Sequence, residues 1–226
     1  DVGASQTIDQ TKLFGNSVRW FHDPGVASYE AAPTWRALAN HVVARALTPI
    51  PGPVHMNLPF REPLVGDVVD MPPTREHDGP WSGHMAAKAR LTDWEIDDLA
   101  LRLVGRRGVI IAGDCGGGYD IGAYAAAATV LASVLDWPLF ADPRSGARVE
   151  GGNIVAHFDG IVRSQAASSQ LQPDIVLRLG APPASKVLGQ WVSTTGAEQV
   201  VVHSFGTYHD PDHAVSQHIE ADIINT

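Results

Sequence analysis

Residues 108–120 read GVIIAGDCGGGYD, an apolar run that ends in glycine and leads into helical sequence at 120–135. A short apolar run bounded by glycine is typical of a buried β-strand. Similar runs recur at 137–142, 174–180 and 199–205, separated by stretches with helical periodicity. Short apolar strands that alternate with helices predict an α/β fold, a Rossmann-like domain with a parallel sheet flanked by helices.

A helix and a strand are also predicted nearer the start of the chain. Apolar residues recur at helical spacing over 28–47, where Thr34 stands near the start as a candidate cap. The run at 53–58 follows as a strand, fenced by prolines on both sides. This helix and strand indicate a second α/β region, which the family resemblance given below implies to be the C-terminal part of a second α/β domain.

The division of the chain follows from a change in composition. Residues 61–91 are rich in Pro, Gly, Asp, His and Arg and show little periodicity, which is typical of a connector between domains. We therefore predict one region in 1–60, a linker in 61–91 and an α/β domain in 92–226; the resemblance given below implies that the first is part of a domain and the last a central domain. Because the chain has no initiator Met and ends beside a predicted strand, we expect it to be a piece of a longer polypeptide.

Bulk composition narrows the class of protein. Sixteen Lys and Arg against 25 Asp and Glu give a net charge of −9, which argues against a partner made of nucleic acid. The longest Ala-rich apolar stretch, 121–135, is too short to predict a membrane span. A single cysteine, Cys115, excludes an internal disulfide, fits a reducing cytoplasm and is expected to be a packed residue.

The glycine-rich loop at 113–120 has two interpretations. It follows a strand and opens a helix, where backbone N–H groups can hold a phosphate. The dinucleotide fingerprint is incomplete, however, because Ile121 stands at the third glycine position and the only candidate acidic residue, Asp142, is followed by proline. A tight turn is favoured over a nucleotide site.

Basic residues follow two of the predicted strands. Arg144 and Arg148 come after the strand at 137–142, and Lys186 opens the helix after the strand at 174–180. Ligands of parallel sheets bind beyond the carboxyl ends of the strands, where Arg and Lys suit carboxylates or phosphates. The alternative is a solvated loop with surface charges. For His209-Asp-Pro-Asp-His213, a polar turn is favoured over a metal site, and we predict no metal ligands in this chain.

Four segments, in this order and spacing, resemble the thiamine-diphosphate-dependent synthase family MenD, the 2-succinyl-5-enolpyruvyl-6-hydroxy-3-cyclohexene-1-carboxylate synthases of menaquinone biosynthesis. They are SQTIDQTKLFG (5–15), GPVHMNLPFREPL (52–64), LFADPRSGAR (139–148) and LGAPPASK (179–186). The resemblance implies that 1–60 is the end of a pyrimidine-binding domain and that 92–226 is the central domain. It also implies that the motifs that hold thiamine diphosphate and Mg²⁺ lie outside this chain.

The resemblance further implies a reaction. Family members decarboxylate 2-oxoglutarate on the cofactor and add the succinyl unit to isochorismate, so this chain is expected to be part of a transferase and inactive alone. Implied substrate- or cofactor-binding residues are Ser5, Gln6, Ser185 and Lys186, with no catalytic residue in this piece. Some members bind a feedback inhibitor through arginines. Arg144, Arg148 and Arg178 are residues of the same type near strand ends, but they are not aligned with those arginines position by position.

The longer protein is expected to be a cytoplasmic homo-oligomer, a dimer or tetramer. Two alternatives stay open from the sequence. One is another thiamine-diphosphate enzyme, of the acetolactate synthase or oxoacid decarboxylase type. The other is a stand-alone α/β binding or regulatory module.

Overall fold

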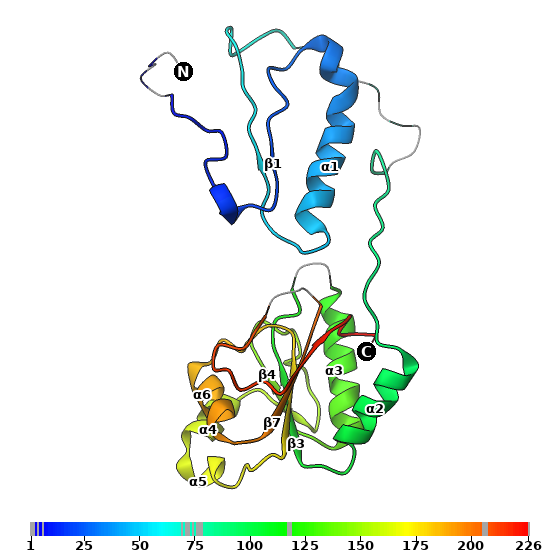
Figure 1. Cartoon of the computed structure of the whole chain (residues 1–226), viewed down its shortest axis with the longest axis vertical. Helices are drawn as coiled ribbons and strands as arrows, with labels where there is room; N and C mark the ends of the chain where they lie inside the picture. Colours follow the sequence, from blue (N-terminus) through cyan, green and yellow to red (C-terminus); the bar gives the residue numbers. More distant parts are fainter. Residues whose placement is uncertain are drawn as a thin grey trace. The chain divides into compact units, whose positions relative to one another are not determined.

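A computed structural model describes the whole chain except residues 1, 2, 4, 6, 69, 71, 72, 74, 76–78, 117, 118, 205–207 and 226. It divides the chain into two compact units, Asp1–Ala86 and Ala87–Thr226. Each unit is drawn in Figure 1 and is described here by itself.

The first unit pairs two short strands beside one long helix. Its elements are the 3₁₀ helix η1 (Gly15–Ser17), β1 (Phe21–His22), the 3₁₀ helix η2 (Tyr29–Thr34), α1 (Trp35–Leu47) and β2 (His55–Met56). The two strands run parallel, with Phe21 opposite His55 and His22 opposite Met56. The helix and strand predicted over 28–47 and 53–58 are confirmed, whereas the two-residue β1 was not predicted because it is too short to carry a pattern.

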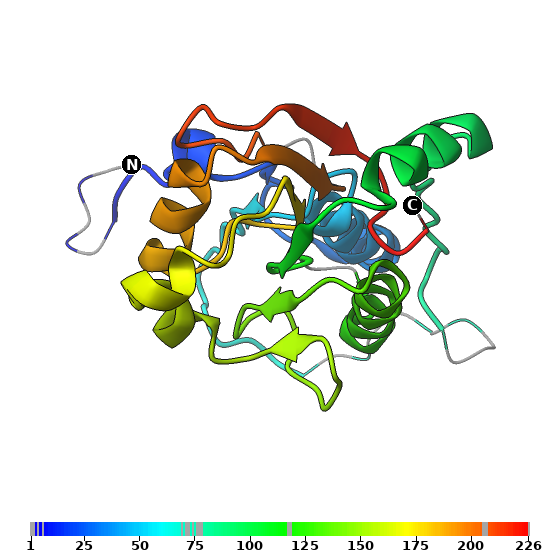
Figure 2. The same ribbon diagram turned by 90° about the horizontal axis from the view of Figure 1, so that it is seen from below.

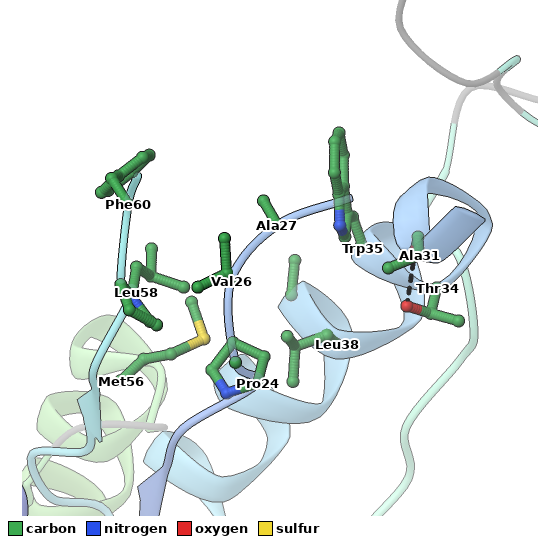
Figure 3. Close-up of a pocket in the computed structure, with 13 residues that line it drawn as sticks. Pro24, Val26, Ala27, Ala31, Thr34, Trp35, Leu38, Met56, Leu58 and Phe60 are labelled. Atoms are coloured by element: carbon green, nitrogen blue, oxygen red, sulfur yellow. Dashed lines mark hydrogen bonds between the residues drawn. The ribbon is translucent and has the colours of Figure 1, made fainter. Parts of the chain in front are cut away.

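The predicted cap at Thr34 is wrong. Thr34 already has helical backbone angles, and its hydroxyl donates back to the Ala31 carbonyl over 2.7 Å rather than accepting from a later N–H (Figure 3). Ser28 caps the segment instead, since its hydroxyl accepts from the Ala31 N–H at the start of η2. The 3₁₀ turn moves the cap six residues upstream.

The second unit is an α/β sandwich around a six-stranded, fully parallel sheet. The strands lie in the order β5-β4-β3-β6-β7-β8. In Figures 1 and 2, α2 and α3 cover one face of this sheet, and α4, α5 and α6 cover the other. The elements are α2 (Asp93–Leu103), β3 (Gly108–Ala112), α3 (Ile121–Leu135), β4 (Leu139–Ala141), β5 (Ile154–Val155), α4 (Phe158–Arg163), α5 (Gln165–Ser168), β6 (Ile175–Leu179), α6 (Lys186–Thr194), β7 (Glu198–His203) and β8 (Gln217–Glu220).

The central strand β3 explains why the sheet is covered on both faces. All five of its residues are buried, and successive side chains alternate between two hydrophobic clusters. Ile110 packs with the residues of α3, whereas Val109 and Ile111 pack with Phe140, Phe158 and α6. The predicted parallel sheet flanked by helices is therefore confirmed.

The bounds of the two edge strands were not predicted: β5 was missed, and β8 was expected only as a strand near the end of the chain. β5 has only two residues, and β8 reads QHIE, in which only Ile219 is buried. Edge strands are covered incompletely, so their sequences lack the continuous apolar run that marks a central strand. The helical stretch predicted near 161–171 forms two short helices, because Ser164 ends α4 and caps α5. Within the described residues, no helix combines the length and the apolar character that a membrane crossing needs.

Candidate functional site

The loops after β3 and β6 meet at the point where the strand order reverses. A Cβ on Gly113 would lie 1.9 Å from the Ala181 carbonyl oxygen, and one on Gly180 would lie 2.3 Å from that of Asp114. Gly180 also has a φ of +76°, and the Ala181 N–H donates to the Asp114 carbonyl over 2.8 Å. In dinucleotide-binding folds this crevice holds the ligand. Here the two backbones fill it at Gly113 and Gly180, which favours a turn over a nucleotide site at the described start of this loop, 113–116.

The loop after β4 is organised by Asp142, whose side chain is fully buried. One carboxylate oxygen accepts from the backbone N–H and the Nε–H of Arg144, over 3.0 and 3.1 Å. The other accepts from the Ala184 N–H over 2.6 Å. Burial alone would raise the pKa of Asp142, but the hydrogen bonds from Arg144 and Ala184 together lower that pKa below its ordinary value.

The two arginines of this loop are engaged by the protein itself. Arg144 donates to Asp142 and, through Nη2, to the Pro182 carbonyl over 2.7 Å. Arg148 donates from Nε to the Ala141 carbonyl over 3.0 Å, and its guanidinium lies 6.0 Å from the centre of the Phe158 ring. The role of Arg144 and Arg148 in binding an anion or a regulatory ligand therefore stays a prediction. A ligand would have to bind to the guanidinium N–H groups that do not take part in these hydrogen bonds.

Helix α6 begins beside this loop with Ser185 and Lys186. The Ser185 hydroxyl caps the helix by accepting from the Leu188 N–H over 3.0 Å, and it donates to Asp159 over 2.5 Å. Lys186 is exposed and makes no hydrogen bond or ion pair with the described part of the chain. Of the predicted binding residues, Lys186 is thus the one whose charge is available to a ligand.

A pocket of about 320 Å³ lies between the start of α6 and the carboxyl half of the sheet. Its lining combines Ser185 and Lys186 with a partly buried arginine, Arg178, that projects from β6. Burial lowers the pKa of Arg178 below its ordinary value, and the nearby carboxylates of Asp210 and Asp212 offset part of this shift. The rest of the wall is formed by the two aspartates and by Ile111, Pro182, Pro183, Ala184, Gly189, Gln190, Val192, Gln199 and Pro211. Two cations, two carboxylates and two amides in one pocket suit a polar, anionic or zwitterionic ligand.

The pocket contains residues that sequence reasoning did not assign. Gln199 is buried on β7 and accepts from Arg178 over 3.4 Å. Asp210 is buried and accepts from the backbone N–H groups of Ala214 and Val215, so 209–213 forms a polar turn. The available signal was the single arginine in the otherwise apolar strand IVLRL, which marks a polar pocket on one face of the sheet. The turn residues carried no such signal.

The histidines near the end of the chain gather around the same turn. The ring centres of His203 and His209 lie 5.8 Å apart, and those of His203 and His218 lie 5.9 Å apart. Burial, followed by the neighbouring His203 and Arg178, lowers the pKa of His209. Across the described residues, no three His, Cys, Asp or Glu side chains are arranged to hold a metal ion.

The remaining predicted residues lie in the first unit. Ser5 is exposed, and Gln6 falls outside the described residues, so both stay predictions. This unit has a pocket of its own, about 330 Å³ in volume. In Figure 3 its wall is formed by apolar side chains from α1, such as Trp35 and Leu38, and from β2 and the residues after it, such as Met56 and Phe60.

Comparisons with known proteins agree on one group. A family model described as the middle domain of thiamine pyrophosphate enzymes matches residues 75–226. The chain is similar to proteins named 2-succinyl-5-enolpyruvyl-6-hydroxy-3-cyclohexene-1-carboxylate synthase over 98% of its length. Identity is 35% for the protein of Haloquadratum walsbyi, 36% for that of Chloroflexus aurantiacus and 34% for that of Geobacillus kaustophilus.

The chain spans 38–39% of the length of these three relatives. The similarity includes the first unit, which lies mostly before the family match, and it therefore extends beyond the central domain. Since the family model covers more than half of its residues, the chain belongs to the family of thiamine pyrophosphate enzyme middle domains.

Proposed function

We propose that this chain is a portion of a menaquinone-biosynthesis synthase. The whole protein would be a transferase that adds the succinyl unit of decarboxylated 2-oxoglutarate to isochorismate. The supporting observation is the similarity to synthases of one name over 98% of the chain, including the residues before the central domain. That extent favours this synthase over the decarboxylase-type alternative.

The two units receive different roles in this proposal. Residues 1–60 are the end of a pyrimidine-binding domain, 61–91 are a linker and 92–226 are the central domain. Thiamine diphosphate supplies the electron sink for decarboxylation when it is bound. Thiamine diphosphate and Mg²⁺ are proposed to be held by other parts of a cytoplasmic homo-oligomer, as the resemblance in sequence implies.

Within the central domain, Lys186 is proposed to bind a substrate carboxylate. Both substrates are polyanions, and Lys186 is an unengaged cation at the mouth of a polar pocket that also contains Arg178. Ser185 contributes by capping α6, and it keeps one lone pair for a further hydrogen bond. Ser5 and Gln6 stay proposed substrate- or cofactor-binding residues, on the resemblance in sequence alone.

The test uses the whole protein with 2-oxoglutarate, isochorismate, thiamine diphosphate and Mg²⁺. Release of CO₂ together with the succinylated cyclohexene product is expected, and Lys186→Ala should lower kcat/KM about tenfold or more by removing a charge-assisted contact. Arg90→Ala, which removes an exposed cation outside the pocket, is the matched control and should leave kcat/KM unchanged. Failure to form the product would rule out the proposed reaction.

A further inference from the structure

The loop that leads into Lys186 is hydrogen-bonded at its two ends, at Ala181 and Ser185, but it has few donors between them. Residues 182–184 read Pro-Pro-Ala, and proline has no backbone N–H. Ala184 therefore carries the only backbone donor of the three. Lys186 is exposed two residues later, and its side chain cannot anchor the loop because it makes no contact with a described acceptor.

Asp142 takes that one donor. Its carboxylate accepts from Ala184 over 2.6 Å, although the two residues belong to loops after different strands. β4 and β6 are not neighbours, because β3 lies between them in the sheet. The carboxylate thus reaches across the end of the central strand, and its full burial protects the hydrogen bond from competition with water.

Arg144 fixes the same loop at a second point. It donates to the Pro182 carbonyl over 2.7 Å while its Nε–H is held by Asp142. Asp142 itself is anchored by its backbone, since its N–H donates to Ala112 at the end of β3 and its carbonyl accepts from the Ser145 hydroxyl. Pro182 and Ala184 are therefore both tied to one rigid carboxylate.

Asp142 does not line the pocket, whereas Pro182, Ala184 and Lys186 do. Any effect of Asp142 on a ligand must therefore pass through the loop. We propose that Asp142 is a positioning residue. Directly and through Arg144, it fixes the backbone of Pro182–Ala184 and thereby holds Lys186 in the orientation that binds its ligand. The inference rests on the proposed function, because it assigns Lys186 to substrate binding.

The first test measures the loop itself on the 226-residue chain. Asp142→Asn keeps the shape but removes the charge, and it should speed hydrogen exchange at the Ala184 amide about tenfold or more. The matched control is Asp174→Asn, which removes an exposed carboxylate paired with Arg107 just before β6, at the amino ends of the strands. The control should leave Ala184 exchange unchanged, and unchanged exchange in Asp142→Asn would overturn the inference.

The second test is kinetic and uses the whole synthase. Asp142→Asn should raise KM about threefold to tenfold and leave kcat nearly unchanged, since it weakens substrate positioning rather than chemistry. In a Lys186→Ala background the same change should alter kcat/KM by less than about twofold, because the two residues act as a unit. Additive effects of the two substitutions would overturn the inference.

The outcomes separate this inference from the proposed function. If Lys186→Ala lowers kcat/KM and Asp142→Asn does not, the proposed function stands and the positioning role fails. If Lys186→Ala has no effect, substrate binding by Lys186 fails, and Ala184 exchange alone decides whether Asp142 holds the loop. Should Asp142→Asn not fold, Arg144→Gln is the second variant: it removes the hydrogen bond to Pro182 and the Nε–H donor to Asp142 but keeps the hydrogen bond between Asp142 and Ala184. It should give a smaller rise in KM, which Arg144→Lys partly rescues.

Discussion

The two units of the chain differ in how far they bury their apolar side chains. In the second unit, hydrophobic residues fill both faces of a six-stranded sheet, and twelve large side chains are almost wholly inaccessible, among them Tyr124, Phe140 and Phe158. In the first unit, Ala32 is the only buried hydrophobic side chain among the described residues. No residue of α1 is buried.

This difference does not come from a lack of apolar residues. The first unit has Leu58, Phe60 and Val65, which are exposed by 48%, 71% and 91%. It has only two paired strands in its described part, and a pair of strands with one helix offers too little surface to cover them. The burial of apolar side chains therefore depends on how many layers of secondary structure pack together, rather than on how many apolar residues a unit contains. The second unit should therefore provide most of the cooperative stability of the chain.

The largest effect is expected from truncating matched phenylalanines in the two units. Phe140 is 1% exposed and packs against Phe158 and Trp191, with ring centres 5.6 and 5.9 Å away. Phe140→Ala should lower the free energy of unfolding by about 3–5 kcal/mol. Phe60→Ala should change it by less than about 0.5 kcal/mol, because Phe60 is 71% exposed. Urea denaturation measures both changes in the free energy of unfolding. Similar losses for the two variants would contradict the proposed difference between the units.

Two glycines with the same backbone angle give the next comparison. Gly180 and Gly25 have φ values of +76° and +77°, but only Gly180 faces a backbone atom, the Asp114 oxygen. Gly180→Ala combines left-handed strain with a clash and should cost about 2–4 kcal/mol. Gly25→Ala should leave the main thermal transition unmoved, since the first unit contributes little to it. A shift of that transition by Gly25→Ala would argue for a shared core.

An ion-pair cluster in the second unit should make its stability depend on acid. Glu198 is half-buried and accepts from Arg106 over 2.6 Å and from Arg102. These hydrogen bonds lower the pKa of Glu198 below its ordinary value. The folded state therefore gains stability above the unfolded pKa of about 4.3, and the gain is lost as the pH falls through the lowered pKa.

Glu198→Gln tests this pH dependence directly. It should cost about 1–2 kcal/mol at pH 7 and flatten the fall in stability between about pH 5 and pH 3. Asp23 of the first unit also has a lowered pKa, because it accepts from the Gly25 N–H and from Asn57. Asp23→Asn should nevertheless leave the pH profile of the main transition unchanged. Equal effects of the two substitutions would contradict the account.

The smallest effect is expected at the helix caps. Thr92 and Glu95 form a reciprocal capping box at the start of α2. Thr92→Ala should cost about 1 kcal/mol. Ser28→Ala removes the corresponding cap of η2 in the first unit, and it should shift the main transition by less than about 0.3 kcal/mol. Differential scanning calorimetry of the two variants checks the order.

The sequence predicted the central sheet because β3 and β6 are short, almost entirely apolar runs bounded by glycine or turn residues. It did not predict the bounds of β8, whose exposed edge permits a polar sequence. For the site, the positions of Lys186 and the arginines beyond strand ends were predictable from the parallel topology. The engagement of Arg144 was not, because its hydrogen bond to Pro182 joins residues 38 apart in sequence. Long-range hydrogen bonds leave no periodicity in the chain.

Amide hydrogen exchange of the whole chain under native conditions tests the contrast between the units most directly. The amides of β3, β6 and β7, such as those of Ile110, Leu177 and Val201, should exchange only through global unfolding. The amides of His55 and Asn57 in the first unit should exchange at least a hundredfold faster, although both are hydrogen-bonded to the strand beside them. Equal protection of the two groups would contradict the claim that the second unit alone carries the stable core.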